Sequence, residues 1–146
     1  MNNIKRITAL VMAMLMGILM FSGLTNVKAA QTAHVSISSA SANVGDEVTI
    51  TITASSDVKI ELCDIWIDYD ASILQYVNGF NTEGGGTGRL LSSDETSFKV
   101  VFKAINPGTA TISVNKSTSY TGSADEDFMS LTTSSGTVTV KAPASY

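Results

Sequence analysis

Apolar and polar residues alternate along much of the chain after residue 30, and the clearest alternation covers residues 63–70. One set of side chains in this stretch is mostly apolar: Cys63, Ile65, Ile67 and Tyr69. The other set holds three carboxylates and an indole: Asp64, Trp66, Asp68 and Asp70. Because successive side chains of a strand point to opposite faces of a sheet, this period of two predicts a strand whose first set packs against a core.

Weaker alternation recurs along the rest of the chain, with many threonines and valines, which favour the half-buried surface of a sheet. It predicts about nine strands, at 33–39, 47–54, 60–69, 73–77, 89–91, 97–104, 109–114, 128–132 and 136–141. Turn residues such as Asn106-Pro107-Gly108 separate the strands, and no stretch of comparable length has a helical period. The sequence therefore predicts an all-β fold, a single β-sandwich of jelly-roll or immunoglobulin-like type.

The first 29 residues have the three-part layout of a secretory signal peptide. Lys5 and Arg6 precede an apolar run at 7–21, and Val27-Lys28-Ala29 offers small residues at the positions that a signal peptidase reads. The run is short for a bilayer span, which needs about 20 apolar residues. We therefore expect a signal peptide at 1–29, a domain at 30–141 and a C-terminal tail at 142–146. The domain would be secreted from a bacterial cell and would have no membrane attachment after cleavage.

Removing 29 of the 146 residues leaves 117, the size of one domain. This part holds thirteen acidic and six basic residues, a net charge of −7, which disfavours nucleic acid and anionic lipid surfaces as partners. Cys63 is the only cysteine, so the exported domain has no internal disulfide. Its place on the apolar side of its strand predicts a small buried side chain.

The polar side of residues 62–70 is the candidate binding surface. Leu62 and Trp66 are apolar there, and Asp64 and Asp68 are hydrogen-bond acceptors. An exposed aromatic ringed by hydrogen-bonding groups is the composition of a binding hot spot, and it also suits stacking on a sugar ring. The alternative is that a loop or a neighbouring strand covers Trp66, which then belongs to a second small core.

Several stretches of the chain resemble the cohesin domain, the module by which bacterial scaffold proteins capture dockerin-bearing enzymes. Residues 44–50 resemble its early glycine-aspartate turn into a Thr/Val strand. Residues 63–70, with Leu74 after them, resemble its strand that ends in a Tyr-Asp pair followed by a leucine. Residues 98–114 are similar to its Phe-Lys strand, glycine turn and next strand, and residues 136–140 to its closing strand.

The resemblance spans about residues 35–141 and implies a sandwich that captures a dockerin-like protein through a flat sheet face. In many cohesins the aspartate of a Cys-Asp pair lies on the dockerin-facing sheet, and Asp64 occupies that position. The resemblance thus implies that Asp64 accepts hydrogen bonds from the partner. Leu62, Asp64, Trp66 and Asp68 are the expected partner-binding residues.

Two other functions remain open: a carbohydrate-binding module of a secreted polysaccharide-degrading system, and a structural immunoglobulin-like spacer. A sugar-binding face usually carries several aromatic side chains in a line, whereas the mature chain has one tryptophan, so a protein partner is favoured over a polysaccharide. We expect no enzyme. His34 is the only histidine, and no Ser-His-acid or Cys-His set can be argued around it. The carboxylates of residues 64–70 lie along one strand, not across a cleft.

An acidic run in a predicted loop, Asp125, Glu126 and Asp127, gives weak candidate ligands for calcium, because clustered carboxylates suit a hard cation. The spacing does not match an EF-hand loop, and most acidic loop runs are solvated. No other cofactor is expected. No repeat with a period of 20–50 residues is visible, so the chain is one unit, and we expect a monomer.

Overall fold

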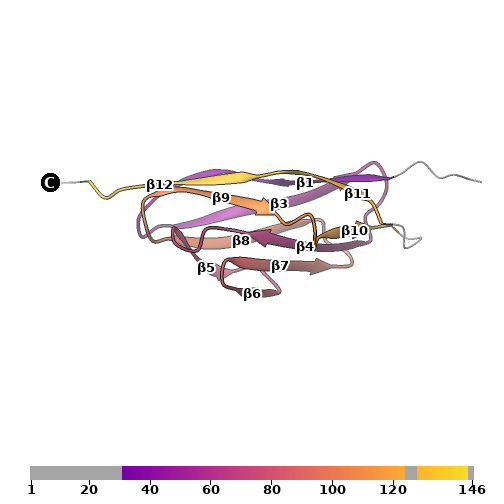
Figure 1. Ribbon diagram of the computed structural model, residues 1–146, viewed down its shortest axis with the longest axis horizontal. Helices are drawn as coiled ribbons and strands as arrows, with labels where there is room; N and C mark the ends of the chain where they lie inside the picture. Colours follow the sequence, from indigo (N-terminus) through magenta and orange to yellow (C-terminus); the bar gives the residue numbers. More distant parts are fainter. Residues whose placement is uncertain (1–30, 124–127, 145–146) are drawn as a thin grey trace, which may run out of the picture. The chain divides into compact units, whose positions relative to one another are not determined.

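The computed structural model describes residues 31–123 and 128–144, and in them the chain folds into two stacked β-sheets (Figure 1). The all-β sandwich predicted from the sequence is therefore confirmed. None of the residues described belongs to a helix that could cross a membrane. The predicted signal peptide at 1–29 lies outside the described residues.

The first sheet has five strands in the order β11-β1-β3-β8-β5. Their bounds are Ser130–Ser134 for β11, Thr32–Ile37 for β1, Glu47–Ser56 for β3, Ser97–Ala104 for β8 and Leu74–Asn78 for β5. Neighbouring strands are antiparallel except β1 and β11, which run parallel.

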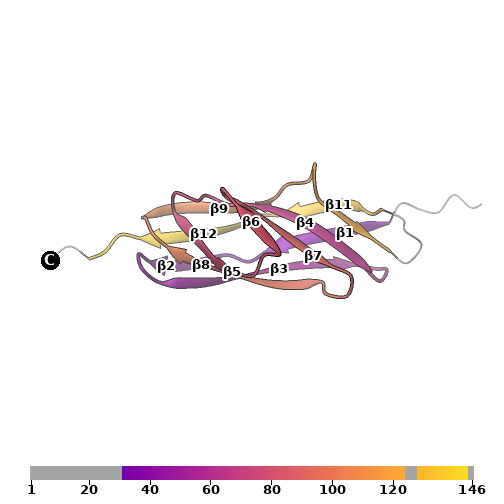
Figure 2. The ribbon, with the colours of Figure 1, turned by 90° about the horizontal axis from the view of Figure 1, so that it is seen from below.

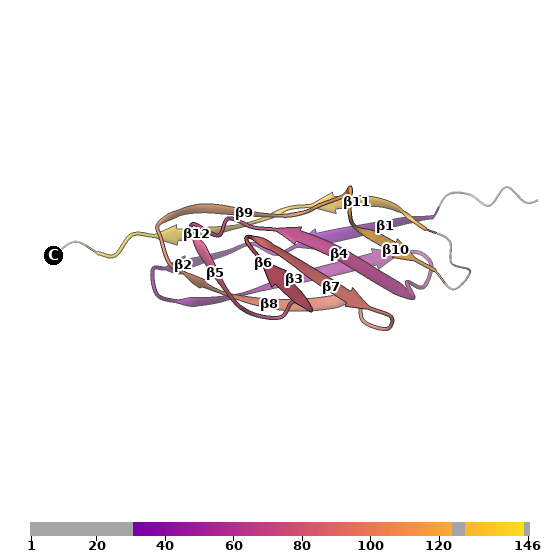
Figure 3. The same cartoon turned by 60° about the horizontal axis from the view of Figure 1, so that its bottom comes forward.

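The second sheet has seven strands, six of them in the order β2-β12-β9-β4-β7-β6. Their bounds are Ala40–Asn43 for β2, Gly136–Lys141 for β12, Gly108–Val114 for β9, Leu62–Asp68 for β4, Thr87–Ser92 for β7 and Thr82–Gly84 for β6. The seventh strand, β10 (Tyr120–Gly122), pairs with β4 on the same edge as β9. Figure 3 shows β4 between β7 on one side and β9 and β10 on the other, and Figure 2 shows β4 with β7 and β9 beside it.

The core lies between the two sheets and is filled by the apolar side chains that alternate along the strands. Its largest fully buried members include Phe102, Ile50, Ile52, Ile65 and Ile67. Tyr69 and Cys63 are also buried, at 9% and 1% exposure, so the inward set predicted for residues 63–69 is correct.

Three short strands were not predicted. β2, β6 and β10 are three or four residues long, and most of their side chains are polar or small. Strands of this length show too few alternations for a period of two to be recognised. The strand predicted at 128–132 begins and ends two residues later, as β11 at Ser130–Ser134.

At two places that lie side by side, the chain passes from the first sheet to the second through a connection of only one or two residues. Residues 38–39 lead from β1 to β2, and Ser135 leads from β11 to β12. The backbones approach closely there, because a Cβ on Gly136 would lie 2.2 Å from the carbonyl oxygen of Ser38. The segment formed by β1 and β2 runs parallel to the segment formed by β11 and β12. β1 pairs with β11 in the first sheet, and β2 pairs with β12 in the second.

Candidate functional site

The four expected partner-binding residues all lie on the outer side of the second sheet, on β4. Side chains directly opposite one another on neighbouring strands share a face, so the register extends this surface to β7 and β10. We call it the β4 face. It comprises Leu62, Asp64, Trp66 and Asp68 of β4, Thr87, Arg89 and Leu91 of β7, and Tyr120 of β10.

Asp64 is not the exposed acceptor that the sequence suggested. Its carboxylate accepts two hydrogen bonds from Arg89, from Nε to Oδ1 at 2.8 Å and from Nη2 to Oδ2 at 2.6 Å. The side chain of Asp64 is 3% exposed, whereas that of Arg89 is 33% exposed. A two-point contact of this kind is among the stronger ion pairs and fixes the geometry of both partners.

Arg89 and Tyr120 set the charge state of Asp64. The hydrogen bonds from Arg89 are the main reason that the pKa of the Asp64 carboxyl lies below its usual value, against the opposing effect of burial. Tyr120, directly opposite Asp64 in the register, lowers this pKa further, and in return Asp64 raises the pKa of the Tyr120 hydroxyl. Asp64 is therefore ionised at neutral pH.

Trp66 lies at the middle of the β4 face and is half-buried. Arg89 is its direct neighbour on β7, and the guanidinium carbon lies 5.2 Å from the centre of the indole ring. This distance is within the range of a cation–π contact. One side chain, Arg89, thus covers part of the Trp66 ring and pairs with Asp64 at the same time.

A five-residue loop lies beside Trp66 on the other edge of β4. β9 pairs with residues 67–68 and β10 with residues 62–64, and residues 115–119 of the intervening chain loop out between them. The loop forms hydrogen bonds with both the carbonyl and the amide of the Trp66 backbone. The amide of Asn115 donates to the Trp66 carbonyl at 2.8 Å, and the Trp66 amide donates to the Ser119 hydroxyl at 2.8 Å.

The remaining residues of the β4 face surround this centre. Leu62 and Asp68 are half-buried, and Asp68 accepts a hydrogen bond from the Thr87 hydroxyl at 3.0 Å. Leu91 is 39% exposed, and Tyr120 packs edge-on against Phe128, which is 73% exposed. The face therefore combines exposed apolar groups with polar groups that already have partners.

Sequence reasoning missed Arg89, Leu91, Tyr120 and Phe128. Arg89 and Leu91 lie in the predicted strand at 89–91, but nothing in the sequence says that this strand pairs with β4. The alternation does place them on the same side of their strand, which is the one signal available. Tyr120 belongs to a strand too short to be predicted.

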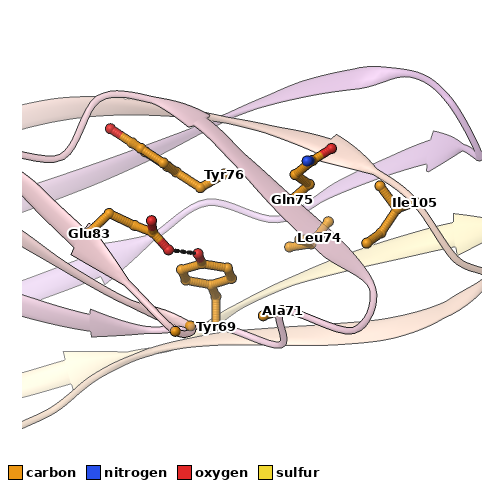
Figure 4. A pocket seen from close by; sticks show the side chains of 9 residues that line it. Tyr69, Ala71, Leu74, Gln75, Tyr76, Glu83 and Ile105 are labelled. Carbon is orange, nitrogen blue, oxygen red and sulfur yellow. Dashed lines mark hydrogen bonds between the residues drawn. The ribbon is translucent and has the colours of Figure 1, made fainter.

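A hollow of about 460 Å³ opens between the end of β4, β5 and the chain around β6 (Figure 4). Tyr69, Leu74, Gln75, Tyr76 and Glu83 are among the residues that line it. The buried Tyr69 hydroxyl donates a hydrogen bond to the Glu83 carboxylate, as Figure 4 shows. Burial and this contact both raise the pKa of Tyr69, so the phenol stays protonated and links β6 to the end of β4.

The other residues singled out in the sequence lie away from the β4 face or outside the described residues. His34 forms hydrogen bonds with Thr132 at 2.8 Å and Ser134 at 3.0 Å, between β1 and β11. The Cys63 thiol is buried, which raises its pKa to about 11. The calcium candidates Asp125, Glu126 and Asp127 lie outside the described residues. Elsewhere, within 31–123 and 128–144, no three metal-ligating side chains come together.

Comparison with known proteins agrees with this arrangement. The family model of the cohesin domain matches residues 33–140. No curated protein matches the chain.

Solved cohesins have the same fold. The seventh ScaB type I cohesin of Pseudobacteroides cellulosolvens is 20% identical, with a TM-score of 0.65 over 78% of this chain and 95% of its own. The sixth cohesin of scaffoldin B of Acetivibrio cellulolyticus, solved in complex with a Cel5 dockerin mutant, is 19% identical, with a TM-score of 0.64 over 75% and 99%. A non-cellulosomal cohesin from the archaeon Archaeoglobus fulgidus is 13% identical, with a TM-score of 0.66 over 75% and 91%.

The family model covers most of the chain, and the solved cohesins share its sandwich fold. The chain belongs to the cohesin domain family.

Proposed function

We propose that this chain is a secreted, non-catalytic binding module that captures a dockerin-like protein through the β4 face. The observation that carries the proposal is the family match over residues 33–140, together with relatives that were solved in complex with dockerins. The geometry of the β4 face supports the choice of surface. Trp66 and its neighbours offer partly exposed apolar area on the outer side of the second sheet.

The expected partner-binding residues have different parts in this proposal. Trp66 and Leu62 would supply apolar contact, and Asp68 would contribute a polar rim with Thr87. Asp64 lies beneath Arg89 and would act mainly by holding it. Interface energy is usually concentrated in a few central residues, with tryptophan and arginine enriched among them.

The polysaccharide alternative is less well supported by the same geometry. A sugar ring stacks flat on an exposed aromatic ring, but the Arg89 guanidinium already lies over Trp66. Tyr120 is on the same face but packs edge-on against Phe128 and does not extend a flat aromatic row with Trp66. These contacts favour a protein partner.

The test is binding of the purified domain to a panel of dockerin modules encoded in the same genome, and to insoluble cellulose. Trp66→Ala should reduce dockerin affinity about thirtyfold or more, since truncating a central aromatic anchor typically costs about 2 kcal/mol. Lys99→Ala is the matched control, because Lys99 is exposed on β8 of the other sheet. Equal dockerin binding by the Trp66→Ala variant and the wild type would contradict the proposal. Retention on cellulose that is lost in Trp66→Ala, with no dockerin bound, would support the sugar-binding alternative instead.

A further inference from the structure

We propose that Arg89 is the residue that contacts the partner at the centre of the β4 face, and that Asp64 is a positioning residue that acts only through Arg89. The inference rests on the proposed function, because it assigns roles within the same surface. It reverses the role that the resemblance implied for Asp64, which was a direct acceptor of hydrogen bonds from the partner.

Asp64 is poorly placed to meet a partner. Both of its carboxylate oxygens already accept hydrogen bonds from Arg89, and its side chain is 3% exposed. It lies between Leu91 on β7 and Tyr120 on β10, which face it directly across the two neighbouring strands. A partner could reach the carboxylate only by displacing Arg89, which would break a short two-point ion pair.

Arg89 is placed to bind. Its side chain is 33% exposed, and the contacts with Asp64 use Nε–H and one N–H of Nη2. A guanidinium has five N–H groups, so three are not used by Asp64. Asp64 fixes the guanidinium at one edge, and the guanidinium carbon lies over the Trp66 ring, 5.2 Å from its centre. A side chain that is already held in place loses little conformational entropy on binding.

The charge around Arg89 indicates the kind of group that it would bind. Arg89 and Asp64 together are neutral, and Asp68 lies on the same face, two residues beyond Trp66, which is directly opposite Arg89. A partner carboxylate would leave an excess negative charge in a contact from which water is excluded, which is unfavourable. A neutral acceptor has no such penalty. We therefore infer that Arg89 donates to a backbone carbonyl or to an amide or hydroxyl oxygen of the partner.

Four variants test these roles against the dockerin that the wild type binds in the panel above: Trp66→Ala, Arg89→Gln, Asp64→Asn and the double variant Arg89→Gln/Asp64→Asn. Affinities are measured by calorimetry well below each melting temperature. Arg89→Gln should weaken binding at least about tenfold. Asp64→Asn should weaken it in the wild type but by less than about twofold when Arg89 is already replaced, because Asp64 then has nothing to position. Arg89→Lys, which keeps the charge but not the planar fork, serves if Arg89→Gln does not fold, and it should also weaken binding.

The opposite pattern would overturn the inference. If Asp64 itself contacts the partner, Arg89→Gln leaves affinity unchanged or raises it, and Asp64→Asn still weakens binding in the Arg89→Gln background. Trp66→Ala separates the two proposals. Loss of binding in Trp66→Ala with normal binding in Arg89→Gln rejects the inference and keeps the function, whereas normal binding in Trp66→Ala rejects the function.

The double variant also tests the chemistry of the acceptor, because it removes the ion pair without changing the net charge of the domain. If the acceptor is neutral, the ratio of its dissociation constant to that of the wild type should be the same at about 50 and about 500 mM salt. If the acceptor is a carboxylate, the ratio should fall clearly at the higher salt concentration, and the assignment of a neutral acceptor is wrong.

Discussion

At the scale of single residues, the ion pair of Asp64 with Arg89 is the feature with the clearest measurable consequence. The Asp64 carboxylate is buried, and the partly exposed Arg89 lies between it and the solvent. Arg89 keeps the pKa of this carboxyl below its ordinary value. A group whose pKa is lower in the folded than in the unfolded protein adds stability at a pH above the unfolded value, which for aspartate is about 3.9. That stability is lost as the pH falls through the folded pKa.

We therefore expect Asp64→Asn to be less stable than the wild type by a constant amount above about pH 5. The difference should shrink as the pH is lowered from about 4 toward about 2, because the wild-type carboxyl then becomes protonated and loses its advantage. Urea unfolding of both proteins at a series of pH values measures this. A difference that stays the same across the whole series would show that folding does not lower the pKa of Asp64.

The same residue shows how far the sequence could predict the site. Alternation placed Asp64 and Trp66 correctly on the outer side of β4, and Cys63 correctly on the inner side. It could not predict that Asp64 is covered, because the covering residues belong to other strands. Arg89 reaches Asp64 from a strand 25 positions later, and Tyr120 from a strand of three residues. Exposure is set by pairing between distant strands, which a local period does not encode.

At the scale of elements, β4 is the strand that joins the core to the proposed binding surface. Its inner side chains, Ile65 and Ile67, are fully buried between the sheets, and its outer side chains form the β4 face. The period of two was enough to predict this division because every inward residue is apolar. A strand such as β10, where two of three residues are buried and one of these is Thr121, has no such pattern.

The division between the two sides of a strand predicts opposite outcomes for two similar changes. Ile67→Asp places a charge in the core and should cost several kcal/mol, comparable to the whole stability of a domain. Thr51→Asp places the same charge on the outer side of β3, directly opposite Lys99 on β8, and should change the free energy of unfolding by less than about 0.5 kcal/mol. Thermal unfolding followed by circular dichroism compares the two. Similar melting temperatures for both variants would mean that the faces are wrongly assigned.

At the scale of the whole domain, the sequence predicted the sandwich but not its order of strands. Nine strands were expected from their periodicity, and their number and turns sufficed for the fold class. The parallel pairings of β1 with β11 and β2 with β12 join residues about 100 positions apart, and no local pattern indicates them. The close approach at Gly136, where a side chain would meet Ser38, is likewise visible only in three dimensions.

These two parallel pairings determine how the domain would carry a pulling force. β1 and β2 run in the same direction as β11 and β12, so the chain enters the domain at one end, beside Ser130, and leaves it at the other, beside Asn43 (Figure 1). Tension applied through Gln31 and Lys141 would slide the paired strands along each other, and many hydrogen bonds would have to break together. Tension applied through Ser72 and Asn106, which lie side by side at one end of β5 and β8, would open that pair one bond at a time.

Single-molecule pulling should therefore give a clearly higher unfolding force through Gln31 and Lys141 than through Ser72 and Asn106. Forced unfolding depends on the height of the unfolding barrier, so equal forces in the two directions would mean that the parallel pairs do not form that barrier.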